Sequence, residues 1–345
     1  MSSPTPVQSF LGGVALALPV HSLLLLNGSV LGISGFLHRA VRGDPEAFFS
    51  VAAFLAAGVV IGLVEGPVAP AAQSLQRIAL SGLLVGVGTK VRRVFPRRDA
   101  FSDDARSWGR AARLGESLVA TATFFSTAVL TARFAYTDPA PPIAAADWTL
   151  GAHGATLLAL QAIPLALSAC LYFLNPPPAD AAAKPAPPSP LRRLAAAAAS
   201  AHFALALRLS NLTQPARVAA FLRPGRAWDP SLACLALGAL PLATALYQRA
   251  RGPEAPRLGG AWGVPRGRVV DGRLVGGAVV FGVGWGLGGI CRASTKLRSA
   301  LTMADWFRIS AGPGLVNLGA SLATGVGITE MGTWVSAVVL GGLFV

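Results

Sequence analysis

The chain has 345 residues, of which 53% are hydrophobic and only 13% are charged. A soluble domain carries roughly a quarter charged residues, so this composition excludes an ordinary soluble domain and predicts an all-α, polytopic membrane protein. The formal net charge of +14 comes from Lys and Arg in the connections between apolar runs, with no basic motif interleaved with aromatic residues. We therefore predict no nucleic-acid partner and attribute these charges to cytoplasmic loops.

The first apolar run, Phe10 to Leu37, is expected to stay in the protein as a membrane helix. The N-terminal sequence MSSPTPVQSF lacks the positive flank of a signal peptide. Within the run, Asn27 and three glycines at 28, 32 and 35 interrupt the apolar pattern. They predict a broken or re-entrant piece, and the equal alternative is a helix end followed by an ordinary polar turn.

Four further spans are predicted in the first half, at 48–64, 78–89, 117–132 and 148–174. The last of them has no charge over a length that exceeds the roughly 20 residues needed to cross the hydrocarbon. Between the second and third, the segment 91–113 carries seven arginines and three aspartates, so it is not expected to cross lipid.

A proline-rich stretch, Asn175 to Pro190, divides the chain into halves of similar size. Proline at this density favours an extended, solvated linker. We predict a first transmembrane repeat at 1–174, a Pro/Ala-rich linker at 175–193 and a second transmembrane repeat at 194–345. Residue-level similarity between the halves is weak.

The second half continues with apolar runs separated by turns and one basic loop. The runs are 194–209, 232–247, 274–291, 311–329 and 331–345; SNLTQPARVAAFL, a WDPS turn at 228–231 and a basic loop at 249–273 lie between them. Nine or ten spans are expected in the whole chain. Short, glycine-broken spans are typical of transporter segments that form a binding site near the membrane midplane.

The glycine-rich stretch Leu274 to Cys291 is the strongest candidate for a functional segment. Glycine lets membrane helices approach closely, which would clear space around Cys291. The alternative is that Cys291 is a small buried hydrophobe, and this alternative is favoured for Cys170 and Cys234.

Residues that could carry other chemistry are scattered. Gly282 to Gly289 lacks the preceding strand and following Lys of a phosphate loop. The four histidines have no metal-site spacing, and Glu65 and Glu330 stand near span ends. We predict no enzyme activity, cofactor or metal.

Five stretches resemble the YeeE/YedE family of integral membrane sulfur-transport proteins, and together they span nearly the whole chain. They are FGVGWGLGGIC at 281–291, GPGL at 312–315, SNLTQPARVAAFL with WDPSLA at 210–233, LLLNGSVLGISG at 24–35 and SGLLVGVGTK at 81–90.

The resemblance implies two pseudo-symmetric repeats whose helices enter the membrane partway from both sides and form a narrow path. It implies thiosulfate or a related small sulfur anion as the solute, handed along by pore cysteines. Cys291 matches the second-half cysteine of the family. The substrate path implied by the resemblance also contains Gly284, Gly286, Gly288, Gly289, Gly312, Pro313 and Gly314.

Two segments depart from the family pattern. After SGLLVGVGTK the family has a short segment with Gly and Cys, whereas residues 91–113 contain no Cys. Residues 292–311 separate Cys291 from GPGL, which normally follows at once. Removing 292–311 would restore the junction, which suggests a gene-model artefact such as retained intron sequence; divergence to a non-transporting relative is the rival explanation.

Other functions remain open at this stage: a channel for another small solute, or a structural or partner-binding membrane protein. We expect a multi-pass protein of the plasma membrane, with an internal membrane as the alternative, and membrane lipid as a partner. The sequence leaves the orientation, the coupling ion and the oligomeric state open.

Overall fold

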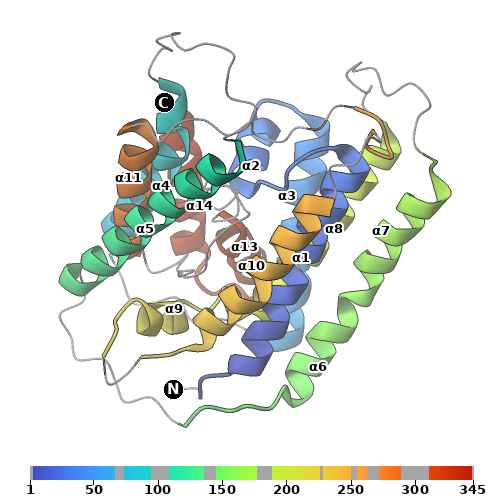
Figure 1. Cartoon of the computed structure of the whole chain (residues 1–345). Helices are drawn as coiled ribbons and strands as arrows, with labels where there is room; N and C mark the ends of the chain where they lie inside the picture. The colour runs from blue at the N-terminus through green and yellow to red at the C-terminus, as the bar shows by residue number, and fades with distance from the viewer. Residues whose placement is uncertain are drawn as a thin grey trace.

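The computed structural model consists of helices, and no strand occurs in its described residues. These residues are 3–66, 74–94, 109–135, 145–176, 189–225, 228–249, 255–260, 262, 272–288 and 311–343. The predicted all-α class is therefore confirmed. Figure 1 shows the helices as one bundle, with α6 and α7 along one side.

The first three helices show how local residues set the helix ends. Helix α1 (Pro6–Asn27) begins with Pro at its first turn and stops at Gly28, whose φ of +67° suits glycine. After five non-helical residues, 28–32, α2 (Ile33–Val41) forms only nine residues of helix. Helix α3 (Pro45–Glu65) is capped by Asp44, whose carboxylate accepts hydrogen bonds from two backbone N–H groups. Helix α1 thus ends at Asn27, as both alternatives for this run predicted.

The remaining first-half helices differ in detail from the predicted spans. Helix α4 (Leu75–Val94) continues past the apolar run that ends at Thr89, and α5 (Gly109–Ala135) begins before its apolar part. The predicted single span at 148–174 is two helices, α6 (Gly151–Leu160) and α7 (Ala162–Leu174). Pro164 explains this break, because it has no N–H for the carbonyl of Leu160 and its ring crowds that carbonyl.

The second half contains α8 (Pro190–Leu209), α9 (Pro215–Phe221), α10 (Ser231–Arg249), α11 (Gly272–Gly288), α13 (Ala311–Thr324) and α14 (Ile328–Leu343). The predicted WDPS turn precedes α10, where Asp229 accepts a hydrogen bond from the Ser231 N–H. The predicted run 311–329 ends earlier, at Thr324, because Gly325 and Gly327 adopt positive φ values of 75° and 74°.

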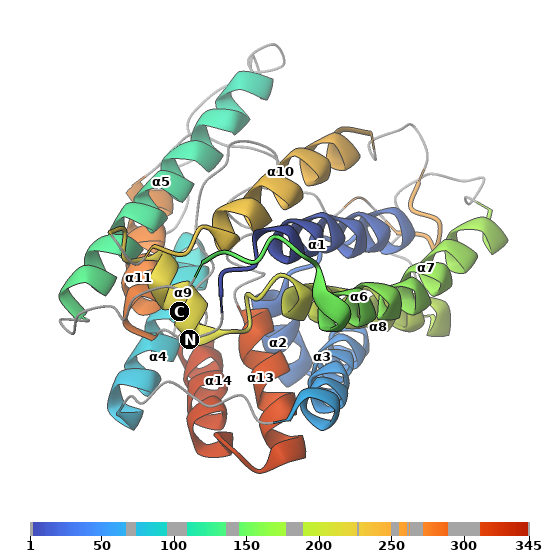
Figure 2. The same ribbon diagram turned by 90° about the horizontal axis from the view of Figure 1, so that it is seen from below.

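The helices of the two halves pack against each other in exchanged pairs. Helix α1 lies along α10, as α8 lies along α3, and α1 and α8 also pack on each other. Helix α4 packs on α11; α5 covers α11 and α14 covers α4. Helix α13 packs on α3, and Figure 2 shows α13 and α14 side by side.

Helices α1 and α8 run antiparallel, because each end of α1 contacts the opposite end of α8. The Asn27 side chain donates a hydrogen bond of 2.9 Å to the Arg192 carbonyl near the start of α8. Just beyond the other end of α8, the Asn211 side chain donates to the hydroxyls of Thr5 and Ser9, at 2.9 and 3.2 Å. We call these two regions the Asn27 end and the Asn211 end. A 22-residue helix separates them by about 33 Å, close to the thickness of the membrane hydrocarbon.

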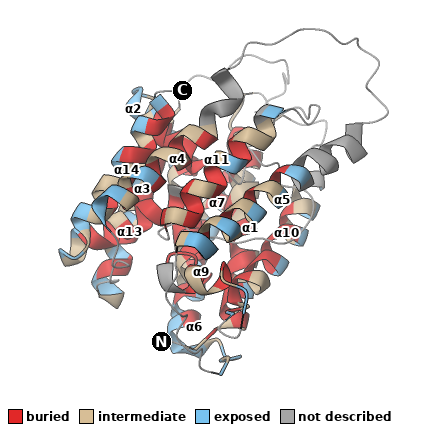
Figure 3. Ribbon diagram, turned by 90° about the vertical axis from the view of Figure 1, so that its left-hand side faces the viewer, coloured by how far each residue is buried: buried red, intermediate tan, exposed pale blue. Residues whose placement is uncertain are grey.

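Within the described part of the chain, three helical segments are long and apolar enough to cross a membrane: α1, α3 and the α6–α7 segment Gly151–Leu174. Shorter apolar stretches occur in α4, α5, α10, α11 and α14. Buried residues concentrate on the inner helices, while α3 and α5 carry many exposed positions (Figure 3). The large exposed side chains are apolar on α3 and α7, for example Leu63 at 70% and Phe173 at 81% exposure.

Candidate functional site

The glycines of α11 form two packing faces, one for each neighbouring helix. A Cβ atom at Gly284 would lie 2.9 Å from the Ser81 carbonyl oxygen of α4, and one at Gly288 would lie 2.5 Å from Ser81 Oγ. On the α5 side, a Cβ atom at Gly282 would lie 2.6 Å from the Phe124 carbonyl oxygen, and one at Gly286 would lie 2.7 Å from that of Ala128. Glycine is therefore required on both faces, since any side chain would force α11 away from a neighbour.

The spacing of these glycines explains why α11 can pack closely against α4 and α5 at the same time. Residues four apart lie on the same face of a helix, so Gly282 and Gly286 form one face and Gly284 and Gly288 the other. The large side chains between them, Phe281 and Trp285, are buried and contact the ring of Phe124.

Helix α4 uses the same device toward α14. Cβ atoms at Gly82 and Gly86 would collide with the carbonyl oxygens of Trp334 and Val338. On α3, Gly58 and Gly62 face Val316, Gly319 and Ala320 of α13 in the same way. Close backbone contact through small residues four apart is typical of helix pairs in membranes.

Trp334 brings together the glycine segments that precede and follow Cys291 in the sequence. Its side chain is 1% exposed and lies against Gly314 of α13 on one side. A Cβ atom at Gly288 would lie 3.8 Å from its indole nitrogen, and one at Gly82 3.3 Å from its Cδ1. We call Ser81, Gly82, Gly288, Gly314 and Trp334 the Trp334 cluster.

The N-terminal turns of two helices meet beside this cluster. A Cβ atom at Gly312 of α13 would lie 2.5 Å from Cδ1 of Ile33, the first residue of α2. Pro313 is buried in the same turn. Gly32 caps α2 and has no side chain with which to accept from the first N–H groups. Helix N-termini carry partial positive charge, so this arrangement suits an anion.

The predicted path residues fall into three groups. Gly284 and Gly286 pack α11 against α4 and α5. Gly288 and Gly314 lie against Trp334, whereas Gly312 packs against Ile33 and is followed by the buried Pro313 in the first turn of α13. Cys291 and Gly289 lie outside the described residues, as do residues 95–108 and 292–310 of the two segments that depart from the family pattern.

The remaining predicted chemical groups take structural positions. Cys170 is exposed on α7, and Cys234 is partly buried on α10. Glu65 at the end of α3 is an ion-pair partner of Arg208, and its carboxylate lies 3.2 Å from Nε2 of His153.

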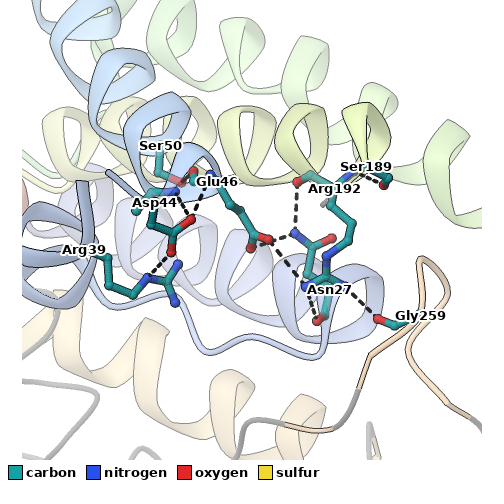
Figure 4. A network of polar contacts seen from close by, with 9 residues as sticks. Asn27, Arg39, Asp44, Glu46, Ser50, Ser189, Arg192 and Gly259 are labelled. Atoms are coloured by element: carbon teal, nitrogen blue, oxygen red, sulfur yellow. Dashed lines mark hydrogen bonds and ion pairs between the residues drawn. The ribbon is translucent and has the colours of Figure 1, made fainter. Parts of the chain in front are cut away.

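Polar networks close both ends of the antiparallel α1–α8 pair. At the Asn27 end, Asn27, Glu46 and Arg192 contact one another; Arg192 lies 3.4 Å from the Glu46 carboxylate and donates to the Gly259 carbonyl (Figure 4). At the Asn211 end, the Thr5 N–H donates to Ser231 Oγ at 2.9 Å. Arg217 pairs with Asp229 at 3.4 Å there.

Sequence reasoning missed Trp334 and the role of Asn211. Trp334 lies within an apolar run, where no local pattern distinguishes a side chain between helices from one facing lipid. Asn211 offered a signal, since a polar amide next to an apolar run indicates a buried partner in a membrane protein.

Comparison with known proteins places the chain among transporters. Residues 192–307 match the model of a family described as "Family of unknown function (DUF6691)". A "Probable transporter" of Xylella fastidiosa strain Temecula1 is 38% identical over 104 residues, which cover 30% of this chain and 70% of the relative. A second "Probable transporter", from Xylella fastidiosa strain 9a5c, is 33% identical over 135 residues, 36% of this chain and 90% of the relative.

The fold and these relatives define a helical membrane protein with a transport role. The chain belongs to the family of these probable transporters. No solved structure matches the chain.

Proposed function

We propose that the protein carries thiosulfate or a similar small sulfur-containing anion across the plasma membrane, as a multi-pass relative of the YeeE/YedE transporters. The observation that supports a path most directly is the Trp334 cluster. Two glycine segments that flank Cys291 in the sequence, represented by Gly288 and Gly314, meet at one buried side chain. Ser81 and Gly82 of the first half lie at the same side chain, which supports a path between the two halves.

We propose that residues 1–174 and 194–345 are two repeats of inverted orientation joined by the linker at 175–193. The antiparallel α1–α8 pair supports this division, and so do the exchanged packing partners: α1 with α10 and α8 with α3, α5 with α11 and α14 with α4. Inverted repeats are a common architecture of transporters, with the substrate site where the repeats meet.

The proposed path gives each residue a specific task. Gly284, Gly286 and Gly288 let the helices around the path pack closely. Gly289 would extend this role, and Gly312, Pro313 and Gly314 lie in the first turn of α13 beside the path. The N-terminal turns of α2 and α13 would stabilise the anion. Cys291 would contact the solute through its S–H group, which is a weak hydrogen-bond donor suited to a soft sulfur atom.

The test is uptake of labelled thiosulfate by a sulfur-uptake-deficient host that expresses the chain from a sequenced cDNA. We expect uptake that is lost in Cys291→Ala and Cys291→Ser and kept in the matched control Cys170→Ser, because Cys170 is exposed on α7. Uptake unchanged in both Cys291 variants would reject its role. Uptake of an unrelated solute without competition by thiosulfate would identify a different transporter, and absence of uptake by any solute would favour a non-transporting relative. A cDNA that lacks 292–311 would establish the artefact.

A further inference from the structure

Arginines and aromatic rings gather at the Asn27 end. The Arg193 guanidinium lies over the Phe49 ring with its Cζ 5.7 Å from the ring centre. Arg257 lies over the Tyr172 ring at 4.3 Å and also donates a hydrogen bond of 3.0 Å to the Tyr172 hydroxyl. Arg39 lies over Phe36 at 4.9 Å. A guanidinium stacked on a ring face is held in a fixed plane, and its fork of N–H groups matches the geometry of a planar or tetrahedral oxyanion.

The Arg193 pair also borders an apolar surface. Phe48 is 60% exposed and Phe49 44% on α3, and Leu194 on α8 is 42% exposed. Phe173, next to Tyr172 on α7, is 81% exposed. A charged group beside apolar side chains that face outward is the pattern expected where a membrane protein meets both the acyl chains and the headgroups of lipid.

Ion pairs occur at both ends. At the Asn27 end, Arg39 pairs with Asp44 and Arg192 with Glu46. At the opposite end, Arg208 pairs with Glu65 and Arg217 with Asp229. Among described side chains, the Asn211 end carries five arginines and four acids: Arg77, Arg133, Arg208, Arg217, Arg223, Glu65, Asp147, Asp229 and Glu330. The Asn27 end carries six arginines and two acids: Arg39, Arg42, Arg192, Arg193, Arg249, Arg257, Asp44 and Glu46. The turns of α4, α5 and α11 at this end add six more basic positions: Lys90, Arg92, Arg93, Arg110, Arg113 and Arg273. Lys and Arg therefore number twelve here and five at the Asn211 end.

Helix directions assign these residues to the two ends. Helix α13 runs parallel to α3, since Gly58 faces Val316 and Gly62 faces Ala320, and α14 runs parallel to α4. Arg77 at the start of α4 donates to the carbonyls of Leu287 and Ala135, which brings the ends of α11 and α5 to the Asn211 end. The helix directions come from the structure and not from the sequence. The difference in charge between the two ends can be counted only once these directions are known.

We propose that the Asn27 end faces the cytoplasm and that the Phe49–Arg193 and Tyr172–Arg257 pairs bind phosphate headgroups of anionic phospholipids in the cytoplasmic leaflet. Excess Lys and Arg on one side marks the cytoplasmic side of membrane proteins. The negative surface of that leaflet attracts arginines that lie within reach of it. The exposed apolar side chains next to Arg193 favour a lipid over a free phosphate ion, because they would contact its acyl chains.

The lipid site is tested on the full-length protein in detergent by native mass spectrometry, with phosphatidylglycerol or phosphatidylcholine added. We expect preferential retention of phosphatidylglycerol, reduced on the order of tenfold in Arg193→Ala/Arg257→Ala. The control Arg133→Ala changes an exposed arginine at the other end and should leave retention unchanged. Equal retention of the two lipids, or an equal loss in the control, would overturn the site. Excess inorganic phosphate that displaces the signal would show an ion site instead and would also overturn it.

The orientation is tested separately in intact cells with a membrane-impermeant thiol reagent. Arg42→Cys introduces an exposed thiol at the Asn27 end, and Val326→Cys, at a site 40% exposed, introduces one at the Asn211 end. Labelling above that of the parent protein is expected for Val326→Cys in intact cells and for Arg42→Cys only after permeabilisation. The reverse pattern would overturn the assignment. Both measurements are independent of thiosulfate uptake.

Discussion

Gly88 of α4 lies against Phe281 of α11, with 2.8 Å between a Cβ atom at Gly88 and the Phe281 backbone nitrogen. The second contact between α4 and α11 is Gly288 against Ser81. Its residue numbers follow from the first contact, since 288 is 88 plus 200 and 81 is 281 minus 200. The two helices therefore present the same surface to each other, as two subunits do across a two-fold axis. The shared glycines at 82 and 282, 86 and 286, and 88 and 288 are the sequence trace of this relation.

Gly288→Ala should destabilise the α4–α11 contact, while Gly276→Ala on the same helix should not. The added methyl at position 288 meets Ser81 Oγ at 2.5 Å and Cβ at 2.9 Å, whereas position 276 has open space. We expect Gly288→Ala to cost about 1–3 kcal/mol as an overpacked site. Thermal unfolding of the purified variants in detergent measures the difference. Equal melting temperatures for the two variants would contradict the close contact.

Removing Arg208 alone should be more damaging than removing the whole ion pair. The side chains of Arg208 and Glu65 are 11% and 7% exposed, so Arg208→Met leaves a carboxylate buried. That change should cost about 3–5 kcal/mol, and Arg208→Met/Glu65→Gln should recover much of the loss. A double-mutant cycle on unfolding free energy checks this coupling. If the losses in unfolding free energy of the two single variants added up to that of the double variant, the two side chains would have no coupling energy.

Trp334→Ala should both destabilise the protein and alter transport. Its indole fills the space between α11, α13 and α4, so truncation opens a cavity at a cost of about 3–5 kcal/mol. Trp334→Phe keeps most of the volume and should fold normally, which isolates the effect on labelled-anion uptake. Trp148→Ala, at a residue 67% exposed, is the matched control and should change neither property.

Asn211 should tolerate Gly better than Ala. Its φ of +62° lies in the left-handed region, and its amide donates to Thr5 and Ser9. Both variants lose the hydrogen bonds, but only Ala also strains the backbone, by about 1–2 kcal/mol. Unfolding free energies of Asn211→Gly and Asn211→Ala separate these two contributions. An Ala variant as stable as the Gly variant would show that the turn relaxes.

Composition and periodic glycine predicted the helical class and the close packing of α11, because both follow from local chemistry. The interruption at Asn27 and the turn at Asp229 were predictable for the same reason: Gly28 and Asp229 act on their own neighbours. Pro164 is a local signal for the break between α6 and α7. The prediction of a single span followed instead from the absence of charge over 148–174. The position of Trp334 depends on α4 and α11, which are distant in the sequence, as well as on α13, so no local pattern could reveal it.

The antiparallel α1–α8 pair has a consequence for how such a bundle could arise. If a single half-length polypeptide were to build this assembly from two copies, each copy would have to insert into the bilayer in the opposite direction from its partner. The curated relatives are shorter than this chain, since 104 aligned residues already cover 70% of one of them. When both antiparallel helices belong to one polypeptide, no sequence has to insert into the bilayer in two opposite directions. The loops of each half can then evolve the charges that favour one direction of insertion.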